Sequence, residues 1–126
     1  MRNVAFGWVW VLAGMFGGLA LGLGFQGSNW HGGYTSWRRR LLRLGHVALV
    51  GTGVLNIVYG LGADRLHLPP PLPVVASAAW IAGAVLMPAC CALAAWRARW
   101  PAWLLFSPPV TCLLLAAGLT CWGALR

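Results

Sequence analysis

Residues 36–62 read SWRRRLLRLGHVALVGTGVLNIVYGLG, so a cluster of arginines leads directly into a long apolar segment. As a helix this stretch is about 40 Å long, which exceeds the ~30 Å hydrocarbon core of a bilayer. The sequence therefore predicts a membrane-spanning helix over residues 38–62, with Thr35 or Ser36 as its N-cap. The first turns carry four arginines that we expect at the level of the lipid headgroups: Arg38, Arg39, Arg40 and Arg43.

The composition supports the same class of protein. Of the 126 residues, 60% are hydrophobic and 8% are charged, and the mean hydropathy is +0.76. A soluble domain of this size could not bury so much apolar surface. The basic residues are all arginines, and Asp64 is the single acid, which gives a formal net charge of +8. Because these arginines border apolar runs, we expect the partner to be a bilayer with anionic headgroups and not nucleic acid.

Three further apolar runs are long enough to cross a bilayer, at residues 4–25, 74–96 and 103–125. The first run is longer than the apolar core of a signal peptide and has no good cleavage site after it, so we expect it to be retained. Short connections favour antiparallel neighbours. The sequence thus predicts a single integral membrane domain over residues 1–126, an all-α protein with four transmembrane helices in an antiparallel up-down bundle.

The arginines are divided unequally between the two predicted sides. One side has Arg2, Arg65 and Arg126, and the other has the four arginines named above together with Arg97 and Arg99. The positive-inside rule then predicts a multi-pass protein of the inner, cytoplasmic membrane, with both termini outside and the arginine-rich loops in the cytoplasm. Four tryptophans are expected beside those loops at the headgroup interface: Trp37, Trp96, Trp100 and Trp103.

Glycines mark two faces where helices are expected to pack closely. Gly14, Gly18 and Gly22 recur every four residues and so lie on one face of the first helix. On the second helix a small and polar face is opposed by a face rich in valine. Its members are Gly45, Thr52, Gly53, Asn56, Tyr59 and Gly60. This face is expected to meet a partner helix.

His46 is the strongest candidate for binding a cofactor. A helical imidazole can serve as an axial ligand of haem or as a hydrogen-bond donor to a quinone or tetrapyrrole. Asn56 and Tyr59, on the polar face, complete the candidate set. No other predicted span contains a histidine, so Met15 and Met87 are the internal candidates for a second haem ligand. The alternative is an interfacial histidine bonded to headgroups, water or a neighbouring chain. His31 is expected in a loop, solvated or at headgroup level.

The cysteines and prolines allow weaker interpretations. Cys90, Cys91, Cys112 and Cys121 all lie in apolar runs, with no CxxC and no histidine at zinc-ligand spacing, so we expect packing and no metal site. Pro88 and the Pro108-Pro109 pair interrupt neighbouring helices at comparable depth, and two broken helices can line a cavity or ion site. The alternative is a pair of kinks that shape the bundle.

The sequence gives no sign of an enzyme. No predicted span has a charged residue at its centre, and a chain with one carboxylate side chain cannot perform paired-carboxylate chemistry. The expectation is therefore a structural or accessory subunit of a larger membrane complex of the respiratory or photosynthetic type, in which electron transport takes place, with other membrane subunits as partners. One alternative is a redox protein that binds haem or a quinone through His46. The other is a small transporter or pore around the proline-broken helices.

Overall fold

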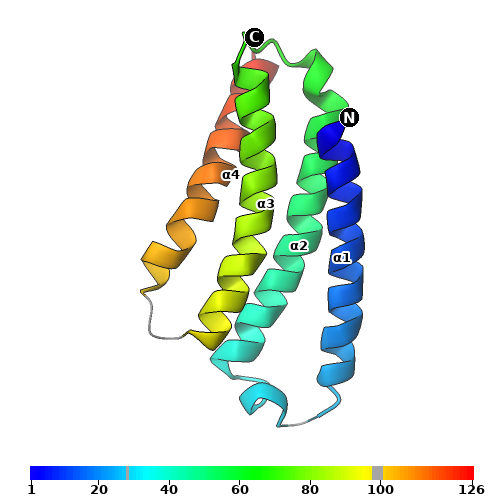
Figure 1. Cartoon of the computed structure of the whole chain (residues 1–126), viewed down its shortest axis with the longest axis vertical. Coiled ribbons are helices and arrows are strands. Elements are labelled where there is room, and N and C mark those ends of the chain that lie inside the picture. Colours follow the sequence, from blue (N-terminus) through cyan, green and yellow to red (C-terminus); the bar gives the residue numbers. More distant parts are fainter. Residues whose placement is uncertain (28, 98–100) are drawn as a thin grey trace.

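The computed structural model describes residues 1–27, 29–97 and 101–126, and these fold into four long α-helices and two short 3-10 helices (Figure 1). The elements are α1 (Arg2–Gly24), η1 (Trp30–Gly32), α2 (Trp37–Gly62), η2 (Ala63–Arg65), α3 (Leu72–Trp96) and α4 (Ala102–Ala124). The four α-helices are long and apolar enough to cross a membrane. The predicted all-helical class with four such helices is confirmed, and each helix begins and ends within two residues of its expected bounds.

The helices begin where the chain offers a cap or a proline. Ser36 is the N-cap of α2, and its Oγ accepts a hydrogen bond from the backbone N–H of Arg39 at 3.3 Å. The same hydroxyl donates to the carbonyl oxygen of His31 at 2.6 Å, so one side chain ties the preceding loop to the start of α2. Helices α3 and α4 begin directly after Pro71 and Pro101, where a missing N–H costs no helical hydrogen bond.

The four helices stand side by side in chain order, and consecutive helices run in opposite directions (Figure 1). Most of the packing is between neighbours in the sequence, with α2 between α1 and α3 and with α4 against the far side of α3. A smaller contact joins α1 to α3. Helices α1 and α4 therefore form the two edges of the row, and both termini lie at the same end of the molecule.

The helices pack together through two clusters of buried side chains. One cluster, toward the end with the termini, joins α2, α3 and α4 through Tyr59, Ala76, Ala79, Trp80 and Ala116. The other, toward the opposite end, contains Leu41, Ala94, Ala95 and Leu105. The indole N–H of Trp80 donates to Thr120 Oγ1 at 3.1 Å, which fixes α4 against α3.

Glycines lie at several points of the contact between α1 and α2. A Cβ at Gly14 would lie 2.6 Å from Val50 Cγ2, and a Cβ at Gly53 would lie 3.0 Å from the carbonyl oxygen of Gly7. Gly60 faces Val4 in the same contact. Within this chain the packing face does not extend to Gly22, because no described atom would lie within 4 Å of a Cβ there. The two helices separate at this end around the cavity described below.

Candidate functional site

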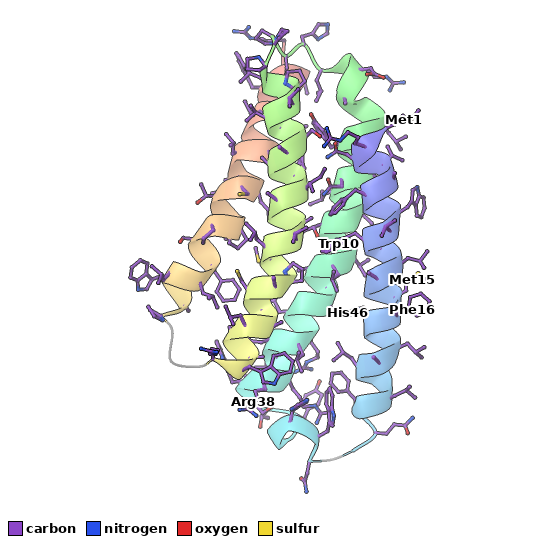
Figure 2. The ribbon with its side chains drawn as sticks, viewed as in Figure 1. Met1, Trp10, Met15, Phe16, Arg38 and His46 are labelled. Carbon is purple, nitrogen blue, oxygen red and sulfur yellow. The ribbon has the colours of Figure 1, made fainter. Side chains whose placement is uncertain are left out.

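His46 projects from α2 toward α1, where Gly18 leaves room for its ring. A Cβ at Gly18 would lie 2.7 Å from His46 Cε1 and 3.1 Å from Nε2, so the imidazole rests against bare backbone of α1. Figure 2 labels His46 on α2, together with Trp10, which crosses from α1 and donates its indole N–H to the carbonyl oxygen of Ala84 on α3 at 3.1 Å. The arrangement places the imidazole where α1, α2 and α3 meet.

A cavity of about 340 Å³ adjoins this imidazole. Helices α1, α2 and α3 supply its sides, and the η1 loop covers the end nearest the arginine-rich part of α2. Its wall consists of Gly17, Ala20, Leu21, Trp30, His31, Leu41, Leu42, Gly45, His46, Leu49, Pro88, Ala92 and Trp96. The lining is almost wholly apolar. Its volume is at the lower end of the roughly 300–1,000 Å³ range of small-molecule sites.

The hydrogen-bonding capacity of His46 is not used up by the protein. Its Nδ1 is buried and has no hydrogen-bond partner among the described residues. A buried polar atom that lacks a partner costs about 1–3 kcal/mol, which is why such atoms are rare in proteins. A hydrogen-bonding group on a molecule in the adjoining space could remove that cost.

His31 lies on the wall of the same cavity as His46, a proximity that the sequence did not predict. Its ring centroid is 4.3 Å from that of Trp30 and 6.4 Å from that of Trp96. The backbone of His31 is in the left-handed region at φ 51°, and Gly32 and Gly33 follow with φ 87° and 84°. These turns fold the loop back over the end of the bundle. The two glycines that follow His31 are the feature of the sequence from which this turn could have been predicted.

Neither methionine named as a second haem ligand shares the cavity. Met15 is 66% exposed and projects from α1 away from the other helices (Figure 2). Met87 lines a different groove, between α2 and Leu113 of α4. Within the described ranges no group of three or more His, Cys, Asp or Glu side chains could hold a metal ion.

Asn56 belongs to a separate hydrogen-bonded network that joins three helices. Its Nδ2 donates to the carbonyl oxygens of Thr52 at 2.9 Å and Trp80 at 3.1 Å, and its Oδ1 accepts from Asn3 Nδ2 at 2.9 Å. Asn3 in turn donates to the carbonyl oxygen of Ser77 at 3.3 Å, and Ser77 Oγ donates to Asn3 Oδ1. The expected bonding across helices is thus made within this chain, to α1 and α3.

The expected set of His46, Asn56 and Tyr59 does not converge on one site. Ten residues separate His46 from Asn56, which is about 15 Å along a helix. Tyr59 is another turn away, and its hydroxyl donates to the carbonyl oxygen of Pro73 at 3.0 Å. Neither residue is among those that line the His46 cavity. A shared helical face does not imply a shared depth, so His46 is the member of the set that lines the cavity.

The face of α2 expected to meet a partner is also occupied within the chain. Asn56 is 0% exposed, and Gly53 and Gly60 pack on α1. Gly45 instead faces α3, where a Cβ would lie 3.2 Å from Cys91 Cβ. The helices that meet this face are thus α1 and α3 of the same chain. The surface that remains for neighbours lies elsewhere on the bundle.

The remaining predicted positions lie near the end of the bundle that carries η1. Pro88 is on the wall of the cavity, whereas Pro108 and Pro109 of α4 are not among its lining residues. The exposed interface candidates are Trp37, Arg38, Arg40, Trp96, Arg97 and Trp103, while Arg43 is half-buried and Arg39 is buried. Arg99 and Trp100 lie outside the described residues.

Comparison of the chain with protein-family models, curated proteins and solved structures found no match.

Proposed function

We propose that this chain is a multi-pass membrane protein that binds a small, mostly apolar molecule in the cavity beside His46. The observation that carries this proposal concerns His46, which lines an apolar cavity of about 340 Å³ and whose buried Nδ1 lacks a partner in the described structure. An apolar pocket with one or two polar atoms is the usual form of a small-molecule site.

The lining indicates the ligand's chemistry. Trp30 and Trp96 offer flat aromatic surfaces, and the two histidines offer nitrogen atoms that donate or accept a hydrogen bond. A planar ring with oxygen atoms at its edge satisfies both requirements, and the headgroup of a quinone is such a ring. A haem or another tetrapyrrole is much larger, and Met15 and Met87 do not supply a second ligand beside His46.

The membrane topology is part of the same proposal. The four apolar helices cross the inner membrane, with the arginines of α2 and Arg97 on the cytoplasmic side and both termini outside. The cavity then lies in the cytoplasmic half of the bilayer, just below the interfacial tryptophans. A lipid-soluble ligand would approach it from the membrane.

Calorimetric titration of the purified protein in mild detergent with decylubiquinone tests the proposal. We expect saturable binding that weakens about tenfold or more in His46→Leu, because a hydrogen bond to a buried group is lost. His67→Leu is the matched control, since His67 is exposed at the opposite end of the molecule. No saturable binding, or equal weakening in both variants, would contradict the proposal. If the purified protein shows a Soret band in its visible spectrum and His46→Ala lacks it, the ligand is haem and not a quinone.

A second candidate function is that of an accessory subunit in a larger membrane complex, such as one engaged in electron transport. Its support is an apolar groove of about 610 Å³ on one face of the row of helices, lined by residues of α2, α3 and α4. Gly51 lies in this groove and has open space around it, as no described atom would lie within 4 Å of its Cβ. Small residues let a second helix approach closely.

Affinity purification from native membranes tests this second candidate. We expect a partner subunit to co-purify with the unchanged chain and to be lost with Gly51→Leu, which fills the groove. Gly22→Leu is the control, because Gly22 is a helical glycine in open space outside the groove. Loss with both variants, or retention with both, would count against the groove as the docking surface.

A further inference from the structure

We propose that Arg39 and Arg43 bind a phosphate group at the start of α2. Arg39 is only 4% exposed, although it carries a permanent positive charge. Its guanidinium lies 4.6 Å from the ring centroid of Phe25 and 5.8 Å from that of Tyr34. The charge thus lies beside two aromatic rings at the junction between α1 and α2. This site is separate from the ligand proposed for the cavity.

The chain has no acid with which to balance this charge. Asp64 is its single acidic side chain, and it lies in η2 at the opposite end of the molecule (Figure 1). Cation–π contacts recover less free energy than burial of an unpaired guanidinium costs. A counter-ion for this charge would therefore come from outside the chain.

Arg43 brings a second cation to the same place. It follows Arg39 by one helical turn, and its guanidinium lies 4.7 Å from the ring centroid of Tyr34. Its Nη2 also contacts the carbonyl oxygen of Tyr34, at 3.5 Å. Two like charges beside one aromatic ring repel each other, and an anion between them would offset that repulsion. The pair therefore forms a positively charged site that favours binding of an anion.

A phosphate group matches this site in both its geometry and its expected location. The planar fork of a guanidinium matches the oxygens of a phosphate group. In the proposed topology this end of α2 lies at the level of the headgroups, where phospholipids present phosphates to the protein. The group is thus the phosphate of an anionic phospholipid or a soluble phosphate, and the two sources are separable by experiment.

Native mass spectrometry in mild detergent provides the test, with dioleoylphosphatidylglycerol and inorganic phosphate as separate probes. We expect lipid binding to weaken about tenfold or more in Arg39→Gln and to change little in Arg40→Gln, because Arg40 is the exposed neighbour with the same charge. Competition by millimolar inorganic phosphate would identify a soluble ion as the source. Equal loss in both variants would show general attraction to the basic surface and would overturn the proposal, as would the absence of binding.

A stability measurement keeps the test valid if a variant folds poorly. Arg39→Met removes the buried charge but keeps an apolar stem, so in lipid-free detergent we expect it to melt no lower than the unchanged protein. Added phosphatidylglycerol or phosphate should raise the melting temperature of the unchanged protein and leave that of Arg39→Met in place. If Arg39→Met melts lower in detergent alone and both proteins gain equally from the additive, the charge is balanced within the chain and the proposal fails.

Discussion

Gly18 of α1 lies directly against the imidazole of His46 on α2, where a Cβ would stand 2.7 Å from Cε1. This contact explains how a histidine fits into the interface of two tightly packed helices. Gly18 belongs to a glycine pattern that is typical of helix packing. The contact links this pattern to His46 Nδ1, the one buried side-chain nitrogen or oxygen atom that lacks a hydrogen-bond partner in the described structure. Small size at position 18 is therefore a condition for the position of His46.

Gly18→Ala is expected to displace the His46 ring. Alanine in place of an exposed helical glycine stabilises by about 1 kcal/mol, so Gly22→Ala, in open space, should raise the melting temperature. At position 18 the clash should cancel that gain and weaken decylubiquinone binding several-fold. Melting curves and titrations of the two variants, side by side, measure the difference. Identical behaviour of the two alanine variants would show that the ring does not depend on Gly18.

Asn56→Leu is expected to destabilise the protein by about 1–3 kcal/mol, because Asn3 then loses its buried partner. Asn3→Leu together with Asn56→Leu should cost less than the sum of the single changes, since both ends of the bond are removed. Unfolding in mixed micelles with increasing denaturing detergent measures these values. Additive effects would argue against the bond as a link between α1 and α2.

Ser36→Ala should affect both the helix and the loop. The N-cap bond to the Arg39 N–H is worth about 1 kcal/mol, and the bond to the His31 carbonyl holds the loop over the cavity. We expect a lower melting temperature together with weaker ligand binding. Ser36→Thr, which keeps the hydroxyl, should restore both. If the alanine variant loses stability but binds the ligand normally, the loop does not contribute to the site.

Single cysteines at Asn29 and His67 test the proposed topology in a background without the native cysteines. Both positions are exposed and lie in loops at opposite ends of the bundle. In intact cells a membrane-impermeant maleimide should label the cysteine at position 67 and should label the one at position 29 only after the membrane is opened. The reverse pattern would invert the orientation, and labelling of both in intact cells would rule out the predicted crossing.

The number and bounds of the helices could be predicted because each depends on local signals. The apolar runs, the Ser36 cap and the prolines before α3 and α4 fix where helices begin. Periodicity also placed Thr52, Asn56 and Tyr59 correctly on one face that is buried. What covers that face could not be predicted, because any apolar helix satisfies the same pattern.

The site was harder to predict than the fold. His46 was identified because a histidine in an apolar helix is conspicuous, but its relation to His31 depends on the left-handed turn of the loop. The burial of Arg39, next to two exposed arginines, depends on how Phe25 and Tyr34 fold over the start of α2. The positions of these side chains depend on contacts with residues distant in the sequence. The three consecutive arginines therefore do not reveal which of them is buried.

The central claim is that a ligand in the cavity supplies the missing partner of His46 Nδ1, and nitrogen-15 NMR of the histidine side chains tests it most directly. The chain has three histidines, so single substitutions assign every signal. On titration with decylubiquinone, the Nδ1 resonance of His46 is predicted to shift saturably, with the affinity found by calorimetry, while the signals of His67 stay in place. Saturable binding that leaves the His46 resonance unmoved would contradict the account.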